Sequence, residues 1–400
     1  MLVAVVVGVL AVAGVTMRVL TAAQRGAARH AIGESDTTIS GTASHGAAAN
    51  SDAATLWEAI PGAFGAPDGA TAQVMSLVRH ENCFTAMGAV RTARSSNIAS
   101  WTSSDDCRSS RLAGSGTALK PPVKERLLGV VDANGTDLWH GEAFAVITDR
   151  ERPHGYLLKG HPGVWTEEDL PADATAAPTA MGPDNPFLLL AGRRKNGLAT
   201  WLYSGWGWNS TPLPAPAGAV PLSAAGMPRL ADTVIPPATV IVGRAGPHAA
   251  IWHSPPGGQD WQYHELTEAR TLTSVVFNGV ELVATGTAST GGPVVLTSTD
   301  GVSWSQDSHP LPLGLLRPFG SLFTTAAPSS AFVLGGPAEP PPPVYAVSET
   351  QSGCGAVYQR SSTAWIEEPL GCHGAPTSLL RLSDGRLAAA GATTLWLRHS

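Results

Sequence analysis

Charge is scarce in this chain of 400 residues, and lysine is scarcer still. Asp, Glu, Lys and Arg make up 14% of the sequence, and 21 of the 25 bases are arginines against a net charge of -6. So few bases leave no basic stripe for neutralising phosphates, which disfavours nucleic-acid binding. Hydrophobic residues still make up 43%, so the composition is that of a folding chain and not of a disordered one.

Helical apolar spacing is also missing. The 44 glycines and 32 prolines exclude a helical bundle, because proline removes a helix donor and glycine carries the largest backbone entropy loss. From Trp57 onward, short apolar runs alternate with clusters of Gly, Pro, Asn, Asp and Ser. That alternation is typical of an all-β protein.

Two short patterns recur at a fixed separation. The first is a serine followed by two apolar residues, at Ser76, Ser274, Ser321 and Ser378. The second is an apolar run that closes on glycine, at Gly88, Gly192, Gly243, Gly286, Gly335 and Gly391. Where both patterns occur, the glycine follows the serine by 12 to 14 residues, which fits two strands joined by a tight turn.

Tryptophans fall into two classes that repeat with the same units. One class sits inside a strand and is followed closely by serine: Trp101, Trp201, Trp252 and Trp396. The other heads a final strand and is followed by leucine: Trp165, Trp208, Trp261, Trp304 and Trp365. Successive members of the second class lie 43 to 61 residues apart, near the ~40–50-residue period of a four-stranded propeller blade.

These repeats predict a β-propeller of seven four-stranded blades, at about 70–117, 126–171, 175–214, 218–267, 271–312, 316–372 and 376–400. The last unit is one strand short. We expect residues 56–60 to supply that strand, because closing the ring with both chain ends removes exposed sheet edges. The predicted propeller domain is therefore 56–400.

The N-terminal region has a different composition. Residues 1–20 contain an apolar run followed by Arg18, and we interpret them as a transmembrane signal anchor helix or a signal peptide. Residues 21–55 are rich in Ala, Ser, Thr and Gly, which predicts a disordered stalk. The chain is expected to be membrane-anchored, or alternatively secreted.

The four cysteines form two local pairs, Cys83 with Cys107 and Cys354 with Cys372. Two disulfides within blades would each stabilise by roughly 3 kcal/mol and imply an extracytoplasmic location. Four reduced, buried thiols are the alternative. The sequence contains no C-x-x-C motif and no pair of histidines at metal-ligand spacing, so we expect no metal and no cofactor.

The segment Ser298-Thr299-Asp300-Gly301-Val302-Ser303-Trp304 resembles the Asp box of BNR and sialidase-like propellers, and the segment around Asp105 resembles it more loosely. The resemblance implies that Asp105, Asp300 and Trp304 are turn and packing residues. Family sialidases also need an arginine cluster and a Tyr–Glu nucleophile. The early F-R-I-P signature is absent, and none of the five tyrosines falls on an expected first strand that faces the channel. A degenerate, non-catalytic member is therefore expected.

Arg79 and Arg381 occupy the same register of the first strand in adjacent blades, and first strands line a propeller channel. They are candidates for an anion clamp, with structural pairing to Asp132, Glu81 or Asp384 as the alternative. Trp206 is a candidate stacking residue, because the core cannot obviously hold three tryptophans from one hairpin.

Other charged groups have simpler interpretations. Arg193-Arg194 and Arg244 follow the glycine pattern and are expected on one face of the disc as unconnected surface charges. The acidic pairs Glu167-Glu168 and Glu367-Glu368 follow a blade tryptophan and are expected to be solvated on an outer strand.

The sequence therefore predicts a monomeric, extracytoplasmic binding or scaffold propeller that recognises a cell-envelope glycan or a protein partner. A sialidase-like glycoside hydrolase is the alternative.

Overall fold

The computed structural model describes residues 17–19 and most of the range 56–399. The gaps within that range are 81–82, 103–112, 119–125, 133–142, 149–153, 162–163, 185–186, 205–206, 228–237, 256–259, 313–314, 316–318, 325–341, 351 and 383.

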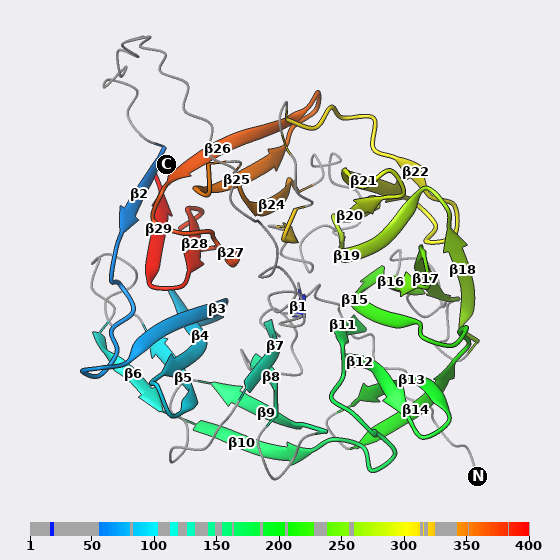
Figure 1. The fold of residues 1–400 in the computed structure, drawn as a ribbon, viewed down its shortest axis with the longest axis horizontal. Coiled ribbons are helices and arrows are strands. Elements are labelled where there is room, and N and C mark those ends of the chain that lie inside the picture. Colours follow the sequence, from blue (N-terminus) through cyan, green and yellow to red (C-terminus); the bar gives the residue numbers. More distant parts are fainter. Residues whose placement is uncertain are drawn as a thin grey trace, which may run out of the picture.

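Seven antiparallel sheets stand radially around a central axis, so the fold is a seven-bladed β-propeller (Figure 1). This confirms the predicted fold class and blade count. We number the blades 1 to 7 along the chain and letter the four strands of each blade A to D, from the innermost to the outermost.

The strands, in the order A to D, have the following bounds. Blades 1 and 2 are β3 (Thr71–His80), β4 (Cys83–Arg91), β5 (Ser96–Thr102) and β6 (Ala113–Ala118), then β7 (Arg126–Asp132), β8 (Ala143–Thr148), β9 (Tyr156–His161) and β10 (Val164–Asp169). Blades 3 and 4 are β11 (Ala180–Asp184), β12 (Phe187–Arg194), β13 (Gly197–Tyr203) and β14 (Trp208–Leu213), then β15 (Val220–Met227), β16 (Ala238–Ala245), β17 (His248–Ser254) and β18 (Gln262–Leu266). Blades 5 and 6 are β19 (Ala269–Phe277), β20 (Leu282–Ala288), β21 (Pro293–Ser298) and β22 (Ser305–Gln306), then β23 (Ser321–Thr324), β24 (Val344–Glu349), β25 (Gly355–Arg360) and β26 (Trp365–Gly371). Blade 7 is β27 (Ser378–Arg381), β28 (Leu387–Gly391), β29 (Thr394–Arg398) and β2 (Trp57–Ile60).

Both ends of the ring meet in blade 7, as the sequence predicts. Its outermost strand, β2, comes from the start of the propeller and pairs antiparallel with β29, from Trp57 opposite Arg398 to Ile60 opposite Leu395. The blade that would otherwise end with an unpaired edge is therefore complete.

A short strand, β1 (Met17–Val19), pairs antiparallel with the innermost strand β7 and lies at the centre of the ring in Figure 1. The rest of the predicted hydrophobic helix at 1–20 and the predicted stalk at 21–55 lie outside the described residues. No helix in the described part of the chain is long and apolar enough to span a membrane.

The glycine pattern marks a point where strand B approaches strand A too closely for a side chain. A Cβ on Gly286 would lie 1.9 Å from the carbonyl oxygen of Thr271 in β19, far inside van der Waals contact. Next to this approach, strand A carries an extra residue between Leu272 and Ser274, which is a β-bulge. The same close approach occurs at Gly88, Gly243 and Gly391.

The serine pattern connects neighbouring blades. The hydroxyl oxygen of a strand-A serine accepts a hydrogen bond from a strand-A amide of the next blade. The described pairs are Leu77 N to Ser378 Oγ at 2.9 Å, Val275 N to Ser223 Oγ at 3.2 Å, and Leu322 N to Ser274 Oγ at 3.0 Å. These bonds join the innermost strands of blades 7 and 1, of blades 4 and 5, and of blades 5 and 6.

The first tryptophan class fills the space between blades. Each member lies in strand C, is fully buried, and donates its indole N–H to the preceding blade or to the connection that leaves it. The acceptors are Gly65 O for Trp101, Asp173 Oδ1 for Trp201, Pro214 O for Trp252 and Leu370 O for Trp396. Each indole ring is buried and its N–H has an acceptor, which explains why tryptophan recurs at this position of strand C.

The structure forms the predicted disulfide between Cys354 and Cys372, 18 residues apart. It joins the start of strand C in blade 6 to the connection that leads into blade 7. The predicted partner of Cys83, Cys107, lies outside the described residues, so that pairing stays a prediction.

Candidate functional site

The two faces of the disc carry different connections. Because the strands of each blade are antiparallel in the order A, B, C, D, the A–B and C–D turns lie on one face, which we name the AB face. The B–C turns and the connections between blades lie on the opposite face, which we name the BC face.

The backbone places three predicted site residues at the AB ends of consecutive innermost strands. Arg381 ends β27 in blade 7, Arg79 is the second-last residue of β3 in blade 1, and Asp132 ends β7 in blade 2. The bond from Leu77 N to Ser378 Oγ holds β3 beside β27. The side chain of Arg381 is exposed, while those of Arg79 and Asp132 lie outside the described part of the structure.

Asp384, one of the alternative partners expected for Arg79 and Arg381, binds Arg386. Asp384, in the A–B turn of blade 7, accepts the backbone amide of Arg386 at 3.0 Å and the Nε of the same residue at 2.7 Å. The carboxylate therefore closes its own turn. Trp206, the predicted stacking residue, lies outside the described residues, between turn residues Ser204 and Gly207.

A buried polar cluster lies next to Arg381 at the junction of blades 6 and 7. Glu368 in β26 is 6% exposed. Its two oxygens accept Arg398 Nη2 at 2.7 Å and Trp57 Nε1 at 2.8 Å. Burial raises the pKa of Tyr345, which lies in β24 and senses the charges of Arg398, Glu368 and Arg381.

This cluster contains the residue types of a sialidase centre, but it is built as packing between blades. Tyr345 is 5% exposed, and a nucleophilic tyrosine needs both access and a lowered pKa. Both oxygens of Glu368 already bind Trp57 and Arg398. Tyr263 does donate to Glu265 at 2.7 Å, but both residues lie on outer strand β18 and no described ion pair brings an arginine to them.

The expectation that both acidic pairs are simply solvated is wrong for the second glutamate of each pair. Glu368 is buried, and Glu168 accepts the hydroxyl of Tyr203 from the next blade. An outer strand packs along the neighbouring blade, so a carboxylate there can meet an aromatic donor that sequence spacing does not reveal.

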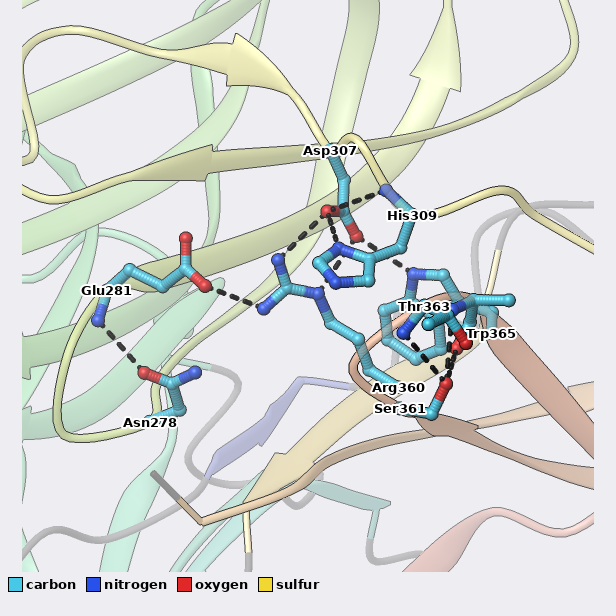
Figure 2. A network of polar contacts seen from close by, with 9 residues as sticks. Asn278, Glu281, Asp307, His309, Arg360, Ser361, Thr363 and Trp365 are labelled. Carbon is cyan, nitrogen blue, oxygen red and sulfur yellow. Dashed lines mark hydrogen bonds and ion pairs between the residues drawn. The ribbon is translucent and has the colours of Figure 1, made fainter. Parts of the chain in front are cut away.

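A second network joins blades 5 and 6 and was not predicted from the sequence (Figure 2). Asp307 accepts Arg360 Nε at 3.0 Å and Nη2 at 2.9 Å, together with Trp365 Nε1 at 2.9 Å. Arg360 also donates to Glu281 Oε1 at 2.7 Å, and His309 Nδ1 lies 2.6 Å from Asp307 Oδ1. Burial acts to raise the pKa of Asp307, but the bonds from Arg360, His309 and Trp365 outweigh it, so the pKa is lowered.

The segment that resembles an Asp box forms a tight C–D turn in blade 5. Asp300 Oδ1 accepts the amides of Ser303 at 2.7 Å and Val302 at 2.8 Å, and these bonds lower the pKa of Asp300 to about 2. Trp304 Nε1 donates to Gly301 O at 3.1 Å. Asp300 and Trp304 thus hold a turn together. The looser box around Asp105 lies outside the described residues.

Exposed large apolar side chains gather toward the AB face. Four such residues occur in the described part of the chain. Val280 and Val302 lie on the A–B and C–D turns of blade 5, and Ile366 and Leu56 lie at the AB ends of outer strands in blades 6 and 7. This face therefore combines an exposed arginine at the channel with apolar positions around it.

Comparisons with known proteins support the fold. No family model and no curated protein matches the sequence. Among solved structures, a streptogramin B lyase aligns with a TM-score of 0.55 at 12% identity, covering 85% of this chain and 97% of that one. YCF48 from Cyanidioschyzon merolae aligns at 0.50 and 11% identity over 86% and 98%, and the BP39L lectin from Burkholderia pseudomallei at 0.50 and 13% over 82% and 98%. These likenesses show a β-propeller fold.

Proposed function

We propose that this chain is a binding propeller whose AB face takes up a protein partner, with Arg381 as the anchor for an acidic group of that partner. The single observation that carries the proposal is the exposed Arg381 at the AB end of an innermost strand, with Arg79 at the matching position of the next blade. Arginine forms bidentate hydrogen bonds with carboxylates, so this position suits such an anchor.

The apolar residues of the AB face favour a protein over a glycan at this surface. Val280 is 58% exposed and Ile366 is 51% exposed. Apolar contacts and arginines are the groups that concentrate at the centre of protein interfaces. The structural neighbours include a protein described as a lectin and one described as a lyase, so the fold alone leaves binding and catalysis open.

A crosslinking experiment tests this proposal. A photoreactive residue is placed at Val280 on the AB face and, as the control, at exposed Ala93 in the B–C turn of blade 1 on the BC face. We expect a protein adduct from position 280 in the native host, and loss of that adduct when Arg381→Gln is added. Equal adducts from both positions, or an adduct unaffected by Arg381→Gln, would refute the assignment.

The sialidase-like alternative has a direct test. Turnover of a fluorogenic sialoside that is abolished by Tyr345→Phe in a folded protein would replace the binding proposal with catalysis. We expect no turnover, because the tyrosine is buried and the glutamate beside it is occupied.

We further propose that the chain is a divergent Asp-box propeller that is anchored in a membrane and faces the extracytoplasmic side. The Asp300 turn supports the first part, and the bond between Cys354 and Cys372 supports an oxidising location. Membrane fractionation and a thiol count on denatured, unreduced protein from the host test the location. Four free thiols would place the propeller in a reducing compartment.

A further inference from the structure

The BC face of blades 3 to 5 concentrates positive charge. In blade 3, Arg193 and Arg194 end strand β12 and Lys195 lies in the B–C turn that follows. In blade 4, Arg244 lies at the same end of β16, and in blade 5 Arg270 lies at the start of β19. Blades 3 and 4 stand side by side in Figure 1, and a shared apolar core joins them. We name these five residues the BC arc.

Within the described residues, no carboxylate neutralises these bases. No ion pair joins a BC-arc residue to a carboxylate in the described part of the chain. Three carboxylates, Asp173, Glu268 and Asp307, lie on the connections that enter or leave these three blades, and Asp307 binds Arg360. Asp173 already accepts Trp201 Nε1 at 2.8 Å and Ser210 Oγ at 3.1 Å. The arc therefore keeps an excess of positive charge in a chain whose net charge is -6.

One member of the arc has an unused donor. Arg194 is half-buried, and its Nε has no hydrogen-bond acceptor among the described residues. Arg193 and Arg244 both follow the close-packed glycine of strand B directly, so they are held at matching positions of adjacent blades. The ends of two strands thus hold these two arginines at the same position of adjacent blades, which suits a ligand that carries more than one negative charge.

The surroundings of the arc favour a polysaccharide. The four exposed large apolar residues of the described chain all lie toward the AB face, so the BC face lacks the apolar centre that a protein interface uses. The tryptophans described in blades 3 to 5 are buried or half-buried, so the arc offers no exposed indole for stacking the bases of single-stranded nucleic acid.

We propose that the BC arc binds an acidic polysaccharide, with arginine forks on successive carboxylates of the polymer. This surface is separate from the AB-face site and does not depend on it. Because the contacts are exposed ion pairs, binding weakens as salt rises.

The test uses polygalacturonate, in which every sugar carries a carboxylate, immobilised for interferometry with the full chain. The variant Arg193→Gln/Lys195→Gln/Arg244→Gln removes three exposed charges. We expect affinity to fall at least roughly tenfold, and the slope of log affinity against log salt to become shallower as contacts are lost. The matched control is Arg386→Gln on the AB face, which should leave affinity unchanged.

Several outcomes would overturn the proposal. They are equal affinity of the triple variant and the wild type when both give the same circular dichroism spectrum, an equal loss in Arg386→Gln, equal binding to neutral dextran, or tighter binding to double-stranded DNA than to polygalacturonate. None of these results touches the crosslink at Val280, so failure here is distinguishable from failure of the AB-face proposal.

Discussion

Replacing Gly286 by alanine tests the physical account of the repeated glycine. The new Cβ would lie 1.9 Å from Thr271 O and 2.8 Å from Leu272 Cα. Ordinary contact begins at 3.4 Å, so strands A and B must separate by about 1.5 Å at this point. That movement breaks about two ladder hydrogen bonds, each contributing about 1 kcal/mol, and adds about 1–3 kcal/mol of overpacking strain.

The expected loss in unfolding free energy for Gly286→Ala is therefore about 3–5 kcal/mol. Urea denaturation followed by tryptophan fluorescence measures it, because strand-C tryptophans such as Trp252 and Trp396 are fully buried when the chain is folded. The matched control is Gly292→Ala in the following B–C turn, where a Cβ meets nothing within 4 Å, and the change should stay within about 0.5 kcal/mol. A loss below about 1 kcal/mol for Gly286→Ala would refute the close-approach explanation.

Three further substitutions probe other contacts. Asp307→Asn leaves the half-buried Arg360 guanidinium with Glu281 as its remaining carboxylate and should cost about 2 kcal/mol in urea unfolding; a cost under about 0.5 kcal/mol would show that this network does not hold blades 5 and 6 together. Cys354→Ser opens a loop of 18 residues closed by Cys372 and should cost about 3 kcal/mol by the same assay, a value that the reduced wild type should reproduce. Burial lowers the pKa of His253 below 6.5, so below pH 6.5 the unfolded chain binds more protons than the folded one and stability falls as pH falls. His253→Gln should flatten that dependence as the pH falls through 6.5, and an unchanged slope would assign the effect to other groups.

The blade architecture was predictable because each blade imposes the same physical demand at the same position. The close approach of strands A and B selects glycine, and the bond between neighbouring strands A selects serine, so both residues recur along the chain. Blade 2 does not follow the serine pattern, and its strand A shows why. Its bulge follows Leu127, and Gly129 stands where other blades place serine. In blade 4, Ser223 was missed because two alanines follow it.

The polar contacts between blades were not predictable in the same way. Glu368 and Trp57 are 311 positions apart, and they meet because the ring closes. Spacing along the chain carries no information about such a pair, so Glu368 looked like an edge residue. The same holds for Asp307 and Arg360, whose contact depends on how two blades pack and not on a repeated pattern.

The closure of blade 7 also determines how the propeller responds to pulling. β2 and β29 are antiparallel, and His399 N donates to Leu56 O at 2.9 Å at the AB end of this pair. A force that draws residues 56 and 399 apart therefore loads the hydrogen bonds between β2 and β29 one at a time, starting at this end. Trp57, the first residue of β2, would leave its buried site against blade 6 and its bond to Glu368 at the start of this opening, so the closure of the ring and the packing between blades 6 and 7 yield together.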